Sequence, residues 1–193
     1  MKLYLIRHGQ TDWNKAGKIQ GSCDIELNEN GLMQAEALCR KFKEEKPPIT
    51  RIYTSNQKRA YQTAAILSKA TNLEMIGMEG LQEVNLGFWE GLSWSEVRDQ
   101  YPTEYEAWYH NRRYDKSHNG ESYQEVVDRA TNAIHTIIKE NKNDIAIVTH
   151  NAVIMCLQCY LTDTPFEEMK NFKSTNTAVT AIDSDLFHKV TSI

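Results

Sequence analysis

The sequence of 193 residues lacks the features of several large classes of protein. No apolar run approaches the roughly 18 residues that a membrane-spanning helix needs, and the N-terminal run at residues 3–6 is too short for a secretory signal. Positive charge is not in excess, because the net charge is −4, and this argues against a general nucleic-acid binder. We therefore expect a cytoplasmic protein with neither a membrane nor a nucleic-acid partner.

Nucleotide-binding and metal-binding motifs are missing too. The chain has no Gly-x-x-x-x-Gly-Lys loop and no cluster of residues with metal-ligand spacing. Its few cysteines include a C-x-x-C pair, Cys156 and Cys159, a spacing found in redox and metal sites. The pair lies in an apolar stretch without a second such pair, so we favour buried, reduced thiols that pack as small hydrophobes. The expectation is a protein that uses no cofactor and no metal.

Strand-like and helix-like segments alternate along the chain. Short apolar runs predict strands at residues 3–6, 51–54, 73–76, 144–149, 177–182 and 188–191. For the last two strands, both a parallel and an antiparallel pairing with the sheet stay open. Helical spacing of apolar residues predicts helices at 29–46, 57–69, 122–140 and 152–161, the first capped by Asn28 and stopped by Pro47. Such alternation predicts an α/β fold, a mostly parallel sheet with helices on both faces.

Residues 88–120 differ from the rest of the chain. They hold three of the four tryptophans and two capping boxes, beginning at Ser93 and Thr103, while Ser122 begins a third box. We predict short helices that form a small cap over the sheet, with most of the aromatic side chains in the core of the cap and one or two facing a cleft. Since the chain shows no linker or repeat, we expect a single domain over residues 1–193.

Five basic side chains in the second half of the cap allow two interpretations. They are His110, Arg112, Arg113, Lys116 and His118. The simpler interpretation is a solvated basic surface without a function. The functional interpretation is a rim around the cleft that attracts an anionic substrate. No role is assigned to His135 or His188.

Two arginines, two histidines and one glutamate follow the predicted parallel strands. They are Arg7, His8, Arg59, Glu83 and His150. Because the carboxyl ends of parallel strands meet at one edge of a sheet, we expect these side chains in one cleft. Arginine grips phosphoryl oxygens with a planar fork of donors, neutral imidazole is a nucleophile, and a carboxylic acid can protonate a departing alkoxide. The set therefore favours phosphoryl transfer.

An ordered series of motifs resembles the histidine phosphatase superfamily, the phosphoglycerate mutase-like proteins. The series is Arg7-His8-Gly9-Gln10-Thr11, Ile19-Gln20-Gly21, Tyr53-Thr54-Ser55 with Arg59, Leu81-x-Glu83, Trp89-Glu90-Gly91 and Val148-Thr149-His150. The resemblance implies the same α/β fold and no metal. It also implies that His8 becomes phosphorylated and that Glu83 is the general acid and base.

The same resemblance assigns the remaining site residues. It implies that Arg7, Arg59 and His150 hold the phosphoryl group. Contacts to phosphate or substrate are implied for Asn14, Gln20 and Gly21. The chain departs from the family pattern at Asn151, where glycine is usual, and this side chain can add a donor to the phosphate or narrow the pocket. Glu90 is nearly as well placed as Glu83, and we expect it to position the cap.

Three functions remain open. The first is a metal-independent phosphomonoester hydrolase that acts on a small phosphorylated metabolite through a phosphohistidine; the others are a phosphoglycerate mutase and a non-catalytic phospholigand-binding module. The run Trp89-Glu90-Gly91 is similar to the small α-ribazole phosphatases and broad-specificity phosphatases, and the chain ends soon after its last predicted strands, without the tail of the mutases. Both nucleophile and acid are present, so we expect the hydrolase. The sequence does not identify the physiological substrate. It also leaves the oligomeric state open, and a homodimer is one of the possibilities.

Overall fold

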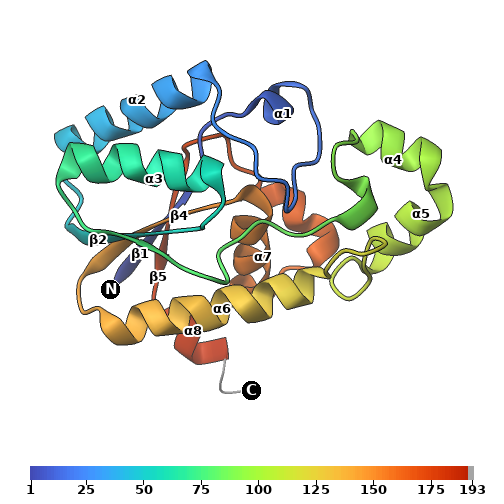
Figure 1. Ribbon diagram of the computed structural model, residues 1–193. Coiled ribbons are helices and arrows are strands. Elements are labelled where there is room, and N and C mark those ends of the chain that lie inside the picture. The colour runs from blue at the N-terminus through green and yellow to red at the C-terminus, as the bar shows by residue number, and fades with distance from the viewer. Residues whose placement is uncertain (191–193) are drawn as a thin grey trace.

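The computed structural model describes residues 1–190 and has one five-stranded sheet in the order β3-β2-β4-β1-β5 (Figure 1). The strands are β1 (Lys2–Arg7), β2 (Ile49–Thr54), β3 (Met75–Gly77), β4 (Asp144–Thr149) and β5 (Val179–Asp183). The first four pair in parallel, and β5 pairs antiparallel with β1. Arg7 stands opposite Thr149 in the register of β1 and β4, so the carboxyl ends of these strands lie together.

Helices cover both faces of the sheet (Figure 1). Because side chains alternate along a strand, Ile6 and Ile52 pack on one face against α2 (Glu29–Glu45) and α3 (Lys58–Thr71). Leu5 and Ile147 pack on the other face against α6 (Tyr123–Glu140) and α7 (Asn151–Thr162). Both faces of the central strands are therefore buried, as expected for a parallel sheet.

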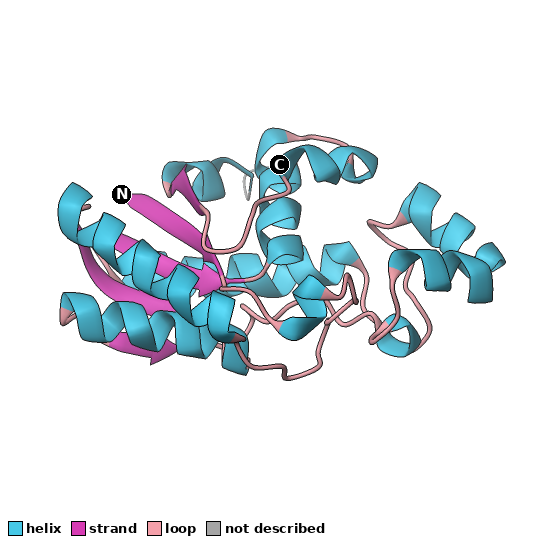
Figure 2. Cartoon of the chain, turned by 90° about the horizontal axis from the view of Figure 1, so that it is seen from above, coloured by secondary structure: helices cyan, strands magenta, loops and turns pink. Residues whose placement is uncertain are grey.

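The cap consists of two short helices, α4 (Trp94–Gln100) and α5 (Pro102–Asn111), which follow the 3₁₀ turn η1 (Gly87–Trp89). Figure 2 shows that this pair of helices stands apart from the strands. The Trp108 ring packs edge-on against Trp89 at 5.2 Å and stacks with Trp94 at 5.4 Å between centroids, and it joins the cap to α6 through Tyr123, 5.8 Å away. Trp89 and Trp108 are buried in the core of the cap as predicted, but more cap aromatics face the cleft than the one or two expected, because Trp94, Tyr105, Trp108 and Tyr109 line the cavity.

Helix caps show where the local prediction works and where it fails. Asn28, Ser93 and Ser122 cap their helices through side-chain oxygens, as predicted. The box at Thr103 is wrong, because α5 begins at Pro102. Proline suits the first helical position, where its missing N–H costs no hydrogen bond, and this places Thr103 inside the helix.

Two further segments differ from expectation. The predicted strand at 188–191 is wrong for residues 188–190, which belong to α8 (Asp185–Val190), while residue 191 lies outside the described residues. A short apolar run fits either structure, and here Phe187 is buried in the core beside α7. The loop after β1 contains one helical turn, α1 (Asp12–Lys15), and η2 (Phe166–Phe172) follows α7; neither was predicted.

Within residues 1–190, no helix combines the length and the apolar character needed to cross a membrane. All four cysteines are free thiols; Cys156 and Cys159 are buried as predicted, and Cys39 is buried as well.

Candidate active site

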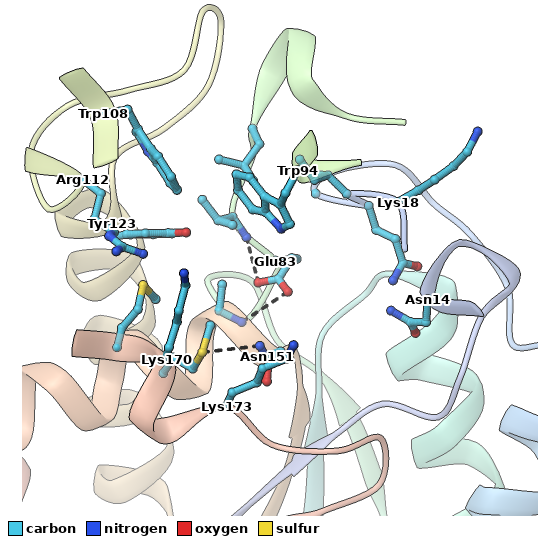
Figure 3. A pocket seen from close by; sticks show the side chains of 18 of the residues that line it. Asn14, Lys18, Glu83, Trp94, Trp108, Arg112, Tyr123, Asn151, Lys170 and Lys173 are labelled. Atoms are coloured by element: carbon cyan, nitrogen blue, oxygen red, sulfur yellow. Dashed lines mark hydrogen bonds between the residues drawn. The ribbon is translucent and has the colours of Figure 1, made fainter. Parts of the chain in front are cut away.

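A cavity of about 390 Å³ lies between the carboxyl edge of the sheet and the cap (Figure 3). Seven of the nine predicted site residues line it: Arg7, His8, Asn14, Gln20, Gly21, Glu83 and Asn151. The other two, Arg59 and His150, are completely buried and do not line it. The His8 and His150 rings are 5.2 Å apart, and Arg59 donates to the carbonyl oxygen of Gly21, so all nine belong to one region.

His8 is held with one ring nitrogen free. Its Nδ1 lies 2.7 Å from the carbonyl oxygen of Gly9, which can only accept, so Nδ1 carries the proton and Nε2 keeps its lone pair. Its main chain is fixed by Thr149, whose carbonyl accepts from the His8 N–H, and by the Asn176 amide, which donates to the His8 carbonyl. Burial first, and then the positive charge of Arg59, holds the pKa of His8 well below its usual value. The imidazole is therefore neutral at pH 7.

His150 caps the N-terminus of α7, and Ser55 determines its proton position. The Ser55 hydroxyl accepts a hydrogen bond from the backbone N–H of Gln57 at 3.3 Å. Among the described residues, the hydroxyl proton itself has one acceptor, Nε2 of His150, which lies 2.9 Å away. Hence Nε2 accepts and Nδ1 carries the proton. Nδ1 is buried and has no partner among the described residues. A buried N–H without a partner is costly, and a phosphoryl oxygen supplies the missing acceptor.

Two guanidinium groups supply positive charge to the site. Arg59 donates to the carbonyl oxygens of Cys23 and Gly21 at 2.7 and 2.8 Å, and Arg7 donates to that of Ser174. In both side chains Nε is buried without a partner in the described chain. Burial lowers the pKa of each below its ordinary value, but arginine stays charged at neutral pH. Each is held by neutral carbonyl groups, which leaves its positive charge available to an anion.

Glu83 presents its carboxyl group to the cavity. Its Oε1 accepts from the N–H of Val84 at 3.1 Å, and its Oε2 accepts from the N–H of Ala152 in the first turn of α7 at 3.3 Å (Figure 3). Burial raises the pKa of Glu83, although Arg59 and these two N–H groups act in the opposite direction. The site therefore favours a protonated carboxyl group more than water does.

Comparison with known proteins identifies the family. The model of the histidine phosphatase superfamily (branch 1) matches residues 3–190. The chain belongs to this superfamily. A metal-independent phosphoserine phosphatase of Arabidopsis thaliana is 34% identical over 164 residues, which cover 83% of this chain and 68% of that protein. Phosphoserine phosphatase 1 of Hydrogenobacter thermophilus is 30% identical over 183 residues, covering 94% and 86%.

Solved structures agree with the sequence relatives. A mycobacterial glucosyl-3-phosphoglycerate phosphatase complexed with VO3 has a TM-score of 0.83 at 28% identity, covering 94% of this chain and 92% of its own. A phosphoserine phosphatase variant from Entamoeba histolytica, in complex with phosphoserine, has a TM-score of 0.82 at 30% identity, covering 93% and 89%. The protein is thus a histidine phosphatase that hydrolyses phosphomonoesters, and the predicted α/β fold and family are confirmed.

The phosphatase site resolves a conflict between the proton states of its two main groups. A nucleophilic His8 must be neutral while an acidic Glu83 is protonated, yet free Glu titrates about two units below free His. The structure lowers the pKa of His8 and raises that of Glu83, mainly by burial in both cases. The two shifts bring the pKa values toward each other and enlarge the population in which both groups carry the protons that they need.

The residues that support Glu83 could not be predicted from the sequence. Gln57 accepts from the Glu83 N–H at 2.8 Å and donates to the Gly21 carbonyl at 3.0 Å, so it ties together two loops of the cavity. Arg129 donates to the carbonyls of residues 80, 82 and 83 and forms an ion pair with Glu121 at 2.6 Å. Glu121 lies in a Gly-Glu-Ser sequence just before the third capping box, but no local pattern identifies its distant partner, Arg129.

Glu90 holds the loop at residues 21–23. Its carboxylate accepts from the N–H and hydroxyl of Ser22, from the Cys23 thiol and from the N–H of Leu86. Gly21 makes room for this carboxylate, because it adopts φ +51° and a Cβ there would lie 2.0 Å from Glu90 Oε1. Glu90 therefore links the start of the cap to the loop whose carbonyls hold Arg59, and it does not line the cavity.

Asn151 and Asn14 use their amides differently. The Oδ1 of Asn151 accepts from the N–H of Ser174 at 3.1 Å, and its Nδ2 donates to the sulfur of Met155 at 3.5 Å, so the side chain ties α7 to the segment before β5. Asn14 accepts through Oδ1 from the N–H of Thr11 and from Asn176. No neighbour in residues 1–190 accepts from Nδ2 of Asn14, which leaves that donor for a ligand in the cavity.

Proposed function

We propose that this phosphatase transfers the phosphoryl group of a small metabolite to Nε2 of His8 and then to water, with Glu83 moving the protons. One observation carries the proposal. The Gly9 carbonyl holds the proton of His8 on Nδ1, which leaves a neutral nucleophile in the same cavity as a carboxyl group with a raised pKa.

In the first step, the lone pair of His8 Nε2 forms a bond to phosphorus, and the bond from phosphorus to the substrate oxygen breaks. The proton of the Glu83 carboxyl group goes to that oxygen, which leaves as an alcohol. Positive charge develops on the phosphorylated imidazole, and the Gly9 carbonyl oxygen stabilises it through Nδ1. Arg7, Arg59 and the Nδ1–H of His150 stabilise the negative charge on the equatorial oxygens.

In the second step, a water oxygen attacks phosphorus and the bond to Nε2 breaks. The Glu83 carboxylate takes a proton from that water, so His8 and Glu83 return to their starting states and phosphate leaves. Water has access because exposed side chains, among them Lys18, Lys170 and Lys173, form part of the cavity wall. This access favours hydrolysis over transfer back to a bound product, the reaction of a mutase.

The variant His8→Ala tests the nucleophile. We expect kcat for a nitrophenyl phosphate to fall by at least about 10³-fold, because no other side chain that lines the cavity within residues 1–190 offers a comparable nucleophile. Quenching the wild type during turnover at neutral pH should trap an acid-labile phosphoryl group that His8→Ala lacks. Retention of more than about a tenth of the activity would contradict the mechanism.

A second assay separates hydrolysis from isomerisation. With 3-phosphoglycerate and a bisphosphoglycerate primer, we expect release of phosphate or no reaction. Formation of the 2-isomer faster than phosphate release would reverse the order of the two functions. The cytoplasmic location and a small phosphomonoester as the partner, with no nucleic acid or membrane, stay predictions of the sequence.

A further inference from the structure

The wall of the cavity carries far more positive than negative charge. Its cationic side chains are Arg7, Lys18, Arg98, Arg112, Lys170 and Lys173. Glu83 is the one carboxyl side chain on the same wall within residues 1–190. None of the six cations takes part in an ion pair with a described carboxylate. A single phosphoryl group at His8 leaves most of this charge uncompensated.

Arg112 is the buried member of this set. It is 3% exposed at the end of α5, and its Nε is buried without a partner among residues 1–190. One Nη donates to the Glu167 carbonyl at 3.2 Å. The guanidinium lies 4.6 Å from the ring centre of Tyr109 and 5.4 Å from that of Trp108, so stacking holds it in place. A buried, preorganised cation without a carboxylate is costly unless an anion binds to it.

Two further donors lie beside Arg112. In Figure 3, Tyr123 and Lys170 are on the same side of Glu83 as Arg112, whereas Asn14 and Lys18 are on the other side. Burial raises the pKa of Tyr123, so its hydroxyl stays protonated and can donate. Lys170 projects from η2, with its ammonium 5.4 Å from the ring centre of Tyr109. An ammonium, a guanidinium and a hydroxyl therefore converge on one side of the cavity.

Four basic residues close to Arg112 in the sequence already have partners. Arg113 donates to Gln124, Lys116 pairs with Glu125 at 2.5 Å, and His110 pairs with Glu106 at 2.8 Å. The His118 ring contacts that of Phe88 at a tilt of 37°, with 4.7 Å between centroids. None of these four lines the cavity. Of these five residues, Arg112 alone belongs to the cavity wall, where Arg98 of α4 also lies.

We propose that Arg112, Lys170 and Tyr123 form a second anion subsite, and that the physiological substrate is a phosphomonoester with a second anionic group. That group, a carboxylate or another phosphate, binds between α5 and η2 while the phosphoryl group lies at His8. The inference rests on the proposed function, since it assumes that the scissile phosphate occupies the His8 end. It excludes neutral alkyl and sugar monophosphates as preferred substrates.

Matched substrates test the subsite. 3-Phosphoglycerate and glycerol 3-phosphate differ only in a carboxylate against a hydroxymethyl group, and fructose 1,6-bisphosphate and fructose 6-phosphate differ by one phosphate. We expect wild type to prefer the more anionic member of at least one pair in kcat/KM. The variants Arg112→Gln and Lys170→Gln should each reduce that preference by about tenfold, mainly through KM, as expected for a charge-assisted hydrogen bond.

Arg113→Gln and Lys116→Gln are the matched controls, because they remove cap charges outside the cavity and should keep the preference. Equal rates of wild type on both members of both pairs would overturn the proposal, as would equal losses on both members in the variants. Lys170 is exposed, so its variant tests the subsite even if Arg112→Gln does not fold. Turnover of nitrophenyl phosphate by wild type but not by His8→Ala tests the proposed function separately.

Discussion

Replacing Glu83 with glutamine separates proton transfer from binding. Glutamine has nearly the same shape, but it cannot protonate a leaving group. Alkyl phosphates need that proton because an alkoxide is a very poor leaving group, whereas nitrophenolate departs largely unaided. We expect Glu83→Gln to lower kcat for glycerol 3-phosphate by about 10²-fold or more, equivalent to about 2.7 kcal/mol of barrier, and to lower it far less for a nitrophenyl phosphate.

The hydrogen bonds of Glu83 limit the structural side effect. Its two carboxyl oxygens accept from Val84 at 3.1 Å and from Ala152 at 3.3 Å, and a glutamine can keep only one of these bonds because its NH₂ cannot accept. Losing one such bond costs about 1 kcal/mol of stability. That cost applies equally to both substrates, so it cannot produce a dependence on the leaving group.

The pH dependence gives the second measurement. Phosphorylation needs Glu83 protonated, and the raised pKa of Glu83 displaces the alkaline limb above the ordinary range of a carboxyl group. It also needs His8 neutral, and the lowered pKa of His8 extends activity to the acid side of the ordinary imidazole range. In Glu83→Gln the alkaline limb should weaken for the alkyl substrate. Glu90→Gln is the control, and a leaving-group-dependent loss in that variant, with none in Glu83→Gln, would refute the assignment.

Three other predictions follow from the same contacts. Ser55→Ala should lower kcat about five- to tenfold by removing the partner of His150 Nε2, and nitrogen NMR of the wild type should show the proton on Nδ1; a proton on Nε2 would contradict the network. Gly21→Ala should lower both the melting temperature and kcat, because it adds about 1–2 kcal/mol of backbone strain and its Cβ displaces Glu90. Gly17→Ala is the control: Gly17 also has a positive φ, +69°, but open space surrounds it, so this variant should lower stability and leave kcat unchanged. Dialysis against a chelator should leave activity unchanged and vanadate should compete with substrate, while activity restored only by a divalent ion would contradict a metal-independent reaction.

Much of the architecture follows from local sequence. The buried runs at residues 3–6 and 144–149 are strands because aliphatic, aromatic and β-branched side chains pack well on both faces of a sheet, and Asn28 and Ser122 begin helices because their side chains satisfy free N–H groups. These effects act within a few residues. The strand-end rule then places Arg7, His8, Glu83 and His150 in one region, because parallel strands share a carboxyl edge.

Only the tertiary structure decides the state of each of these groups. The free Nε2 of His8 depends on its own loop, but the proton of His150 depends on Ser55, 95 positions away, and the loop of Glu83 depends on Arg129. Arg112 and Arg113 show the limit most directly, since they are neighbours of the same charge. One is buried on the cavity wall without a carboxylate, and the other donates to Gln124 outside the cavity. The sequence around the two arginines is the same. They differ in the direction in which each side chain leaves the end of α5, and therefore in the distant segments of the chain that each one contacts.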